Sequence, residues 1–324
     1  MRQGRFGEIG LGRRRKTTRR EQFLDQMQLV VPWARFEGLI VVHYPVAGRG
    51  RRPYPLGAML RIHFMQQWFG LSDPAMEEAL WETPLLRKFA GIDLDFEGVP
   101  DETTILNFRH LLERHALGQA LFDEMAAILT ERGLLLRPKT SLGTIVDATL
   151  IAAPPSTKNQ TRTRDPEMKQ TKKGNQWYFG MKAHIGVDVA SGCVHSADTT
   201  SANVHDSVMT DALLHGEEEI AFGDAAYASK QRSLEAEREA HDVVWATPFK
   251  RKKGQNLTDE QRRINRLMAS YRSTVEHVFR IVKRQFGYTK VRYRGLAKNS
   301  QQIFCLLALA NIYMVRRQIA EPAG

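Results

Sequence analysis

Three acidic residues lie in stretches of sequence that suit metal-dependent chemistry on a phosphodiester. Asp147 lies within the β-branched stretch TIVDATLI, and Asp224 ends the similar stretch IAFGD. Glu276 lies in RSTVEHVFRIVK and is the only carboxylate from Tyr271 to Ser300. Three converging carboxylates cannot all stay ionised without a cation, and oxygen ligands without Cys or His select Mg²⁺ or Mn²⁺. Two such ions about 3.5–4 Å apart would activate a water or a 3′-hydroxyl for attack on a phosphodiester.

The stretch around Glu276 reads as a helix with two adjoining stripes, at about 100° per residue. The apolar stripe, which would dock the helix, holds Val275, Phe279, Val282 and Phe286. The polar stripe holds Arg272, Glu276, Arg280 and Lys283. It would point one carboxylate at a metal ion and a row of cations at flanking phosphates. The helix alone fits a solvated surface equally well, because Arg272 and Arg280 are both i,i+4 neighbours of Glu276.

The elements that would position these acids predict an α/β fold. From Gly143 the chain reads as strand GTIVDATLIA, a long polar loop over 154–176, strands WYFGMKAHIGVDV and CVHSADTTSA, helix NVHDSVMTDALLHG, strand IAFGDAAYAS, helix KQRSLEAEREA, strand DVVWATPF, a basic loop and a long helix. This is the element order of the ribonuclease H-like fold, a mixed sheet flanked by helices. There the first and fourth strands are neighbours, so Asp147 and Asp224 would converge. The last helix would bring Glu276 to the same point.

The N-terminal part, from about Phe23 to Gly133, has a helical pattern. One face of the stretch YPLGAMLRIHFMQQWFG carries Leu56, Leu60, Phe64 and Trp68 at every fourth position. Further short helices begin at Ser72 or Asp73, end at Gly91, and run from Asp101 or Thr103 to Gly118. We expect an all-helical N-terminal domain, and both a helix-turn-helix and a plain helical bundle remain open.

The charge of the chain favours an anionic partner. The 324 residues hold 47 Lys and Arg against 36 Asp and Glu, for a net charge of +11. Such a surplus attracts nucleic acid or an acidic membrane face.

The best apolar run, residues 303–315, is shorter than the roughly 20 residues that span a bilayer, so we expect a buried core helix there. No secretory signal is visible, and Cys193 and Cys305 are too few for a disulfide framework, so a reducing cytoplasm fits best.

Residues outside the three acids have ordinary structural interpretations. We expect Asp188 to be a turn acid and Asp206 to cap a helix. His184, Cys193, His195 and His205 match no zinc-binding spacing. Trp177 and Tyr178 stand beside Lys172 and Lys173, where they would stack on bases or enter the core. No GxxxxGK[ST] phosphate loop or nucleophilic serine motif is present.

Three stretches of the chain, in order, resemble the motifs of DDE transposases encoded by bacterial insertion sequences, of the insertion sequence 5 type. They are TIVDATLI, FGDAAYAS and RSTVEHVFRIVK. Three further segments are similar to the same family: DPEMKQTKKGNQWYFGMKAHIGVD, YPLGAMLRIHFMQQWFGLSD and PDETTILNFRHLLE. The resemblance therefore runs from about Phe23 to Val315. It implies that Asp147, Asp224 and Glu276 are the catalytic, metal-binding triad, with Mg²⁺ or Mn²⁺ as the cofactor.

The positions around Glu276 match that family except at one place. Arg272 and Lys283 fit the steps at which related transposases carry Arg and Lys. The position of their tyrosine is Ala269 here, with Tyr271 displaced by two residues. This departure bears on any role of the tyrosine and not on the acid.

The resemblance implies a transposase that binds transposon ends, cleaves DNA by two-metal hydrolysis and joins the 3′-hydroxyl ends to target DNA. Its partners would be DNA and at least one further copy of the chain, in a bacterial cytoplasm and on the nucleoid when DNA is bound. The expected DNA contacts are Lys172, Lys173, Lys182, Arg272, Arg280 and Lys283. We expect a basic arm at 1–20, a DNA-binding domain at 21–135, a catalytic domain at 136–318 and a tail at 319–324. A nuclease or resolvase without strand transfer, a non-catalytic DNA-binding regulator and a decayed transposase remain as alternatives.

Overall fold

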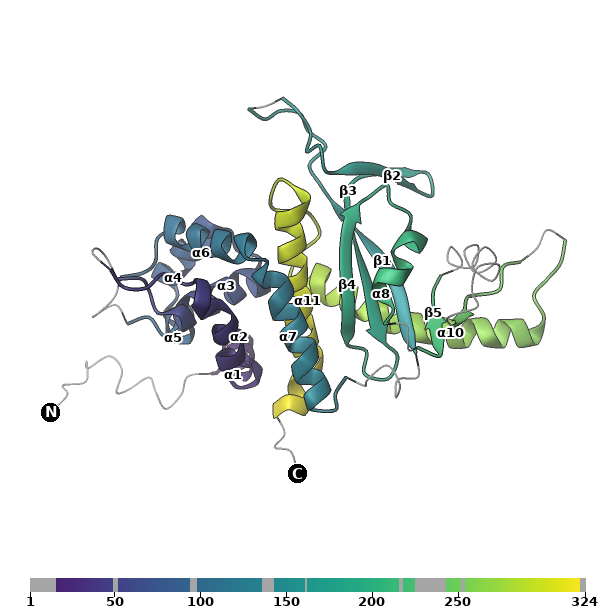
Figure 1. Cartoon of the computed structure of the whole chain (residues 1–324), viewed down its shortest axis with the longest axis horizontal. Coiled ribbons are helices and arrows are strands. Elements are labelled where there is room, and N and C mark those ends of the chain that lie inside the picture. The colour runs from purple at the N-terminus through teal and green to yellow at the C-terminus, as the bar shows by residue number, and fades with distance from the viewer. Residues whose placement is uncertain are drawn as a thin grey trace.

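The computed structural model describes residues 16–48, 52–93, 98–135, 143–160, 162–215, 218–224, 243–251 and 254–320. Figure 1 shows a helical N-terminal part on one side and a sheet on the other, with α7 (Leu117–Glu131) and α11 (Leu296–Ala320) between them. Among the described residues, no helix has both the length and the apolar character needed to cross a membrane.

The N-terminal part is helical, as the sequence predicts. It consists of α1 (Arg19–Val30), α2 (Trp33–Ile40), the 3₁₀ turn η1 (Val41–His43), α3 (Leu56–Phe69), α4 (Asp73–Glu82), α5 (Pro84–Ala90), α6 (Glu102–Arg114) and α7 (Leu117–Glu131). Residues 1–15 of the predicted basic arm lie outside the described residues, and α1 already begins at Arg19. The Ser72 hydroxyl caps α4 and the Asp101 carboxylate caps α6, because each accepts a backbone N–H from the first turn.

The prediction that the helix from Asp101 continues to Gly118 is wrong. Ala116 has a positive φ of 51°, which breaks the helix and starts α7 in a new direction. Gly118 is needed here for a close approach, because a Cβ at this position would lie 2.3 Å from the carbonyl oxygen of Gln301. Gln301 belongs to the last helix of the chain. The missing side chain at Gly118 therefore lets α7 pack tightly against that helix.

The second part is a mixed sheet of β1 (Thr144–Ala152), β2 (Lys169–Lys173), β3 (Gln176–Asp188), β4 (Val194–Ser201), β5 (Ile220–Phe222) and β6 (Val244–Ala246). The order is β2, β3, β1, β5, β6, and β4 pairs with the later part of β3. β1 is antiparallel to β3 and parallel to β5, which is parallel to β6. The loop predicted over 154–176 is too long, because β2 forms a hairpin with β3. Gly174, with a φ of 62°, supplies the tight two-residue turn.

Two predicted elements differ from the observed ones, and a third cannot be compared. The helix predicted at 203–216 is a 3₁₀ turn, η3 (Asp206–Met209), followed by one turn of helix, α8 (Thr210–Leu213). The strand that carries the second acid ends at Phe222, two residues before Asp224. The helix predicted at 230–240 lies outside the described residues.

Three consecutive elements complete the chain: α10 (Asp259–Arg280), the π-helical turn η4 (Ile281–Gln285) and α11 (Leu296–Ala320). A capping box at Thr258 and Gln261 starts α10. Figure 1 shows α10 running across the strands and α11 standing between α7 and the sheet. Asn311 of α11 exchanges two hydrogen bonds with the backbone of Val194 in β4, at 2.9 and 2.8 Å. One hydrophobic core therefore continues from the N-terminal helices through α11 into the sheet.

The two faces of the sheet have different neighbours. Ile145 and Phe222 are paired in register on one face, where the Phe222 ring lies 4.8 Å from the ring of Tyr271 in α10. Val146 lies on the other face, in a small cluster with Leu213 of α8. Alternate residues of β1 therefore face α10 and α8 in turn.

His63 is a buried titratable group at the junction of α3 and α11. Its Nε2 lies 3.8 Å from the Sγ of Cys305. Burial, helped by the charge of Arg109, lowers the pKa of His63 to about 4. The unfolded chain takes up this proton below the ordinary pKa of 6.5, whereas the folded chain does not until about 4. Stability is therefore lost as the pH falls through this window.

We expect a His63→Met variant to lose less stability than the wild-type chain between about pH 7 and pH 4. The difference is at most about 3 kcal/mol, because only the wild-type residue must gain its proton on unfolding. Urea denaturation at several pH values measures it. His205→Gln, at an exposed position, is the control for the loss of an imidazole. An unchanged slope in His63→Met would contradict the assignment.

Candidate active site

Asp147 lies in the middle of β1 and faces α10. Its Oδ1 accepts a hydrogen bond from the Ala148 N–H at 2.8 Å, and its Oδ2 lies 3.8 Å from the Arg272 guanidinium. The side chain is only 19% exposed. Burial raises the pKa of Asp147 above its ordinary value, although the Ala148 N–H and the Arg272 charge act in the opposite direction. The ionised carboxylate therefore lies where additional positive charge would stabilise it.

Asp224 lies two residues beyond the end of β5, the strand next to β1. Ile145 of β1 pairs with Phe222 of β5 in the parallel register, two residues before each of the first two predicted acids. The negative charge of Asp224 contributes to raising the pKa of Asp147. The first two predicted acids are therefore close enough to interact. Two neighbouring carboxylates, both half-buried, form a donor set that fits a hard divalent cation.

Glu276 lies on α10, one helical turn after Arg272, with its side chain exposed. Together with Thr149 of β1 it lines an open groove of about 890 Å³. Two contacts between β1 and this helical segment bracket Glu276. Arg272 approaches Asp147, and the Lys283 ammonium donates a hydrogen bond to the Leu150 carbonyl oxygen at 2.8 Å. Glu276 therefore lies on the groove side of α10. Among the described residues the three acids do not form a group with ligand atoms within 4.8 Å of one another, so the predicted convergence of Glu276 with the two aspartates is not seen.

The apolar and polar stripes predicted for this helix are present with one difference. Val275, Val282 and Phe286 are buried, whereas Phe279 is half-buried and also lines the groove. The π-helical turn after Arg280 shifts the register of the helix just beyond Glu276, so Lys283 reaches β1. The sequence offers no signal for this turn.

The predicted DNA contacts have different environments. Lys172 and Lys173 are exposed on β2, where the Lys172 ammonium lies 6.0 Å from the ring of Trp177. Trp177 is 63% exposed and does not enter the core. Arg280 is exposed in the groove and lies 3.1 Å from the Nδ1 of His277. These positions are accessible to a phosphate backbone.

Lys182 does not suit the predicted DNA contact. Its ammonium donates hydrogen bonds to the Val204 carbonyl oxygen and the Asp206 carboxylate, at 2.6 and 2.8 Å, and its side chain is only 12% exposed. It pairs with Leu150 in register and so faces the α8 side, away from Asp147. Lys182 is a structural cation, and Asp206 is its partner and not a helix cap. The cap of η3 is His205, which accepts the Ser207 N–H.

Other sequence assignments can be compared with the structure directly. Asp188 is buried and accepts the Ser191 N–H at 2.8 Å, so it is the turn acid that the sequence predicts. Thr149 and Ser273 line the groove but were not predicted. Thr149 was detectable in principle, because it stands two residues after Asp147 on the same face of a strand.

The described residues thus form a helical part and a mixed sheet, with a long basic helix across the strands. A family model described as Transposase DDE domain matches residues 138–312, which is more than half of the chain. A second model, described as Transposase domain (DUF772), matches residues 13–111. The chain belongs to the DDE transposase family typical of bacterial insertion sequences. No solved structure matches it.

Proposed function

We propose that this chain is a transposase that cleaves DNA at the ends of a transposon and joins the freed 3′-hydroxyls to target DNA. The observation that carries this proposal is the proximity of two acids: Asp147 on β1, and Asp224 just beyond the end of the adjacent parallel strand β5. The family match supports a transposase in general. The paired acids support the specific chemistry, because phosphodiester hydrolysis and strand transfer are both in-line displacements that one metal site can serve.

We propose a ribonuclease H-like fold for the catalytic domain. The antiparallel β1 and β3, the parallel β1 and β5, and the helix that carries Glu276 across the sheet all support it. We place the domain at 136–318, preceded by a DNA-binding domain at 21–135. The helix α11 contributes to both parts, since it packs on α7 and on β4.

In this mechanism Asp147, Asp224 and Glu276 would hold the divalent cations, with Mg²⁺ or Mn²⁺ as the best match to three carboxylates. When bound, the cations would lower the pKa of the attacking water or 3′-hydroxyl and stabilise the leaving oxygen. Arg272 keeps Asp147 oriented through its contact at 3.8 Å. Lys283 fixes α10 against β1, which sets the position of Glu276.

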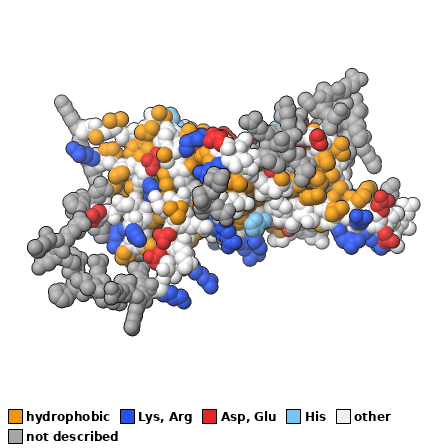
Figure 2. All heavy atoms as spheres, turned by 90° about the horizontal axis from the view of Figure 1, so that it is seen from below, with side chains coloured by type: hydrophobic (Ala, Val, Ile, Leu, Met, Phe, Trp, Pro, Cys, Tyr) orange, Lys and Arg blue, Asp and Glu red, His pale blue; other side chains and the backbone are white. Residues whose placement is uncertain are grey.

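A basic surface that would bind the DNA adjoins these acids. Figure 2, which views the molecule from below, shows Lys and Arg side chains gathered in clusters on this face. The exposed cations of α10 and the following segment are Arg262, Arg263, Arg266, Arg280, Arg284 and Lys290. The charge of Lys173 on β2 adds to burial in lowering the pKa of Lys283, so the hairpin lies near this surface. Binding through such cations weakens steeply with salt.

The test is an assay with labelled DNA that carries the repeats flanking the gene, together with a target plasmid. We expect end cleavage and joined products with Mg²⁺ or Mn²⁺ and neither product with EDTA. Glu276→Gln should lose both activities, whereas the control Glu260→Gln, in the first turn of the same helix, should keep them. Cleavage without joined products would identify a nuclease instead. Binding without cleavage would identify a regulator.

A further inference from the structure

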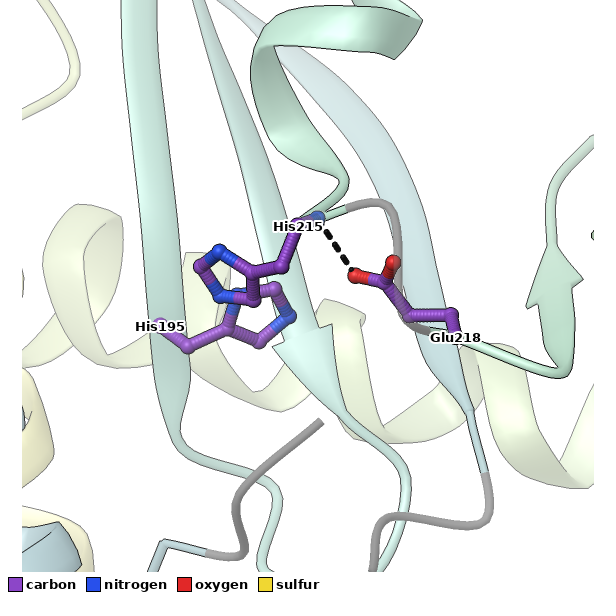
Figure 3. A group of neighbouring side chains, drawn as sticks. All are labelled: His195, His215 and Glu218. Carbon is purple, nitrogen blue, oxygen red and sulfur yellow. Dashed lines mark hydrogen bonds between the residues drawn. The ribbon is translucent and has the colours of Figure 1, made fainter. Parts of the chain in front are cut away.

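A cluster of metal-ligating side chains lies outside the three acids. His195 of β4, His215 after α8 and Glu218 before β5 each bring one ligand atom within 4.8 Å of the others. Figure 3 shows the two imidazole rings against each other with the Glu218 carboxylate facing them. The ring centroids are 4.5 Å apart. Among the described residues, this is the one group of three or more His, Cys, Asp or Glu so arranged.

Hydrogen bonds to Thr144 and to the backbone hold the Glu218 and His195 side chains in place. Glu218 is 4% exposed, and its Oε1 accepts the His215 N–H at 2.7 Å and the Thr144 hydroxyl at 3.3 Å. The Thr144 oxygen also lies 3.1 Å from the Nε2 of His195. Because the hydroxyl gives its hydrogen to Glu218, it can only accept from His195, so Nε2 carries the ring proton. These two contacts of the Thr144 hydroxyl form a relay that orients Glu218 and His195. Hydrogen-bond partners outside the coordination sphere orient metal ligands in the same way.

The relay leaves the Nδ1 of His195 with a lone pair. This nitrogen is buried and has no hydrogen-bond partner among the described residues. Such a lone pair is what an imidazole offers to a metal ion. A Cβ on Gly186 would lie 3.0 Å from the Cε1 of His195, so this glycine leaves room for the ring.

The cluster is separate from the proposed active site. Thr144 and Val146 belong to the face of β1 that packs on α8, whereas Asp147 belongs to the face toward α10. The chemistry also differs, because two nitrogens and one oxygen suit a borderline cation such as Zn²⁺, and an all-carboxylate site suits Mg²⁺.

We propose that His195, His215 and Glu218 form a second, structural metal site that takes Zn²⁺. Ligand atoms about 2.0–2.2 Å from a tetrahedral zinc are closer together than 4.8 Å, so His215, which is exposed, rotates inward on binding. Water fills the fourth position. The site fastens β4 to the connection between α8 and β5, the strand that leads to Asp224. This inference does not depend on the proposed DNA chemistry.

The test uses the full chain with Asp147→Asn, which removes a ligand of the other site. Titration with Co²⁺ should give the visible absorption of a tetrahedral ion, at one equivalent per chain, and Zn²⁺ should displace it. His215→Gln should weaken binding at least about tenfold, and Thr144→Val should weaken it about tenfold by removing the relay. His215 is exposed, so its variant should fold.

The matched control is His115→Gln. His115 and His43 form an exposed stacked pair, with centroids 4.0 Å apart, that no third ligand-bearing side chain joins within the described part of the chain. Equal Co²⁺ binding by the Asp147→Asn chain with and without His215→Gln would overturn the proposal. So would a spectrum without tetrahedral absorption, which would leave the cluster as a hydrogen-bonded group only. A Zn²⁺-dependent rise in Tm that His215→Gln abolishes would support it independently of cleavage.

Discussion

Replacing Asp147 by Asn is expected to lower the rate of metal-dependent DNA cleavage by about 10³-fold. The amide keeps the shape of the side chain and still accepts the Ala148 N–H, but it removes the charge that holds the cation beside Asp224. Because burial raises the pKa of Asp147, its charge costs the folded chain free energy. The variant should therefore fold with an unchanged or raised Tm. Single-turnover cleavage and thermal unfolding measure the two effects.

Asp198→Asn is the matched control for this variant. Asp198 is a half-buried acid of the same sheet, and its Oδ1 likewise accepts the N–H of the next residue, Thr199, at 2.6 Å. It pairs with His184 in register and so lies on the opposite face. We expect it to cleave at close to the wild-type rate. Equal losses in the two variants would mean that Asp147 acts through the sheet and not through a metal.

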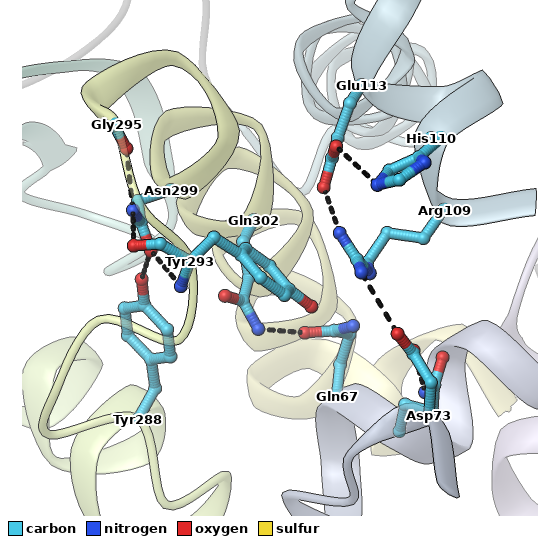
Figure 4. Close-up of polar contacts among 11 residues, drawn as sticks. Gln67, Asp73, Arg109, His110, Glu113, Tyr288, Tyr293, Gly295, Asn299 and Gln302 are labelled. Carbon is cyan, nitrogen blue, oxygen red and sulfur yellow. Dashed lines mark hydrogen bonds and ion pairs between the residues drawn. The ribbon is translucent and has the colours of Figure 1, made fainter. Parts of the chain in front are cut away.

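Replacing Arg109 by Met is expected to lower the free energy of unfolding by about 3–5 kcal/mol. Figure 4 shows the guanidinium between Asp73 of α4 and Glu113 of α6, at 2.9 and 2.6 Å. It also lies 4.1 Å from the ring centre of Tyr293. All three charged side chains are at least mostly buried, so the variant would leave two carboxylates without this cation. Urea denaturation measures the loss.

The Arg35→Met variant tests whether burial, and not the number of ion pairs, determines the loss in the free energy of unfolding. Arg35 also bridges two carboxylates, Glu124 and Glu131 of α7, but its side chain is 48% exposed. Exposed pairs contribute little, so we expect a loss of at most about 1 kcal/mol. Similar losses in Arg35→Met and Arg109→Met would show that the buried position of Arg109 does not matter.

The contacts around Arg109 also connect the helical part to the segment that follows α10 and η4. Asn299 of α11 donates hydrogen bonds to the carbonyl oxygens of Tyr293 and Gly295, at 2.8 and 2.7 Å. Gln302 donates to Gln67 of α3 at 3.0 Å. These bonds fix the chain between η4 and α11, and hence the end of the helix that carries Glu276. Contacts far from the acids thus contribute to their placement.

Local signals were sufficient to predict several features. The caps at Ser72 and Asp101 were visible as residue types before helical patterns, and Gly91 marked a helix end. The β-branched stretch around Asp147 predicted β1, and the strand order placed Asp224 near it. The stripes around Glu276 predicted which side of α10 docks.

Features that depend on distant partners were not predicted. The strand β2 is polar and exposed, so its pairing with β3 leaves no hydrophobic pattern, although the Gly-Asn turn was a usable signal. Lys182 could not be recognised as structural, because its partner Asp206 comes from another element. His215 and Glu218 stand three residues apart, but His195 joins them only through the sheet.

The central claim is that Asp147 and Asp224, joined by Glu276, hold a catalytic metal. The most direct test is anomalous scattering from crystals of the chain soaked in Mn²⁺. The account predicts a peak about 2 Å from carboxylate oxygens of both Asp147 and Asp224 that is absent in Asp147→Asn crystals. A map without that peak, in which the Asp147 carboxylate contacts only Arg272 and the Ala148 N–H, would contradict it.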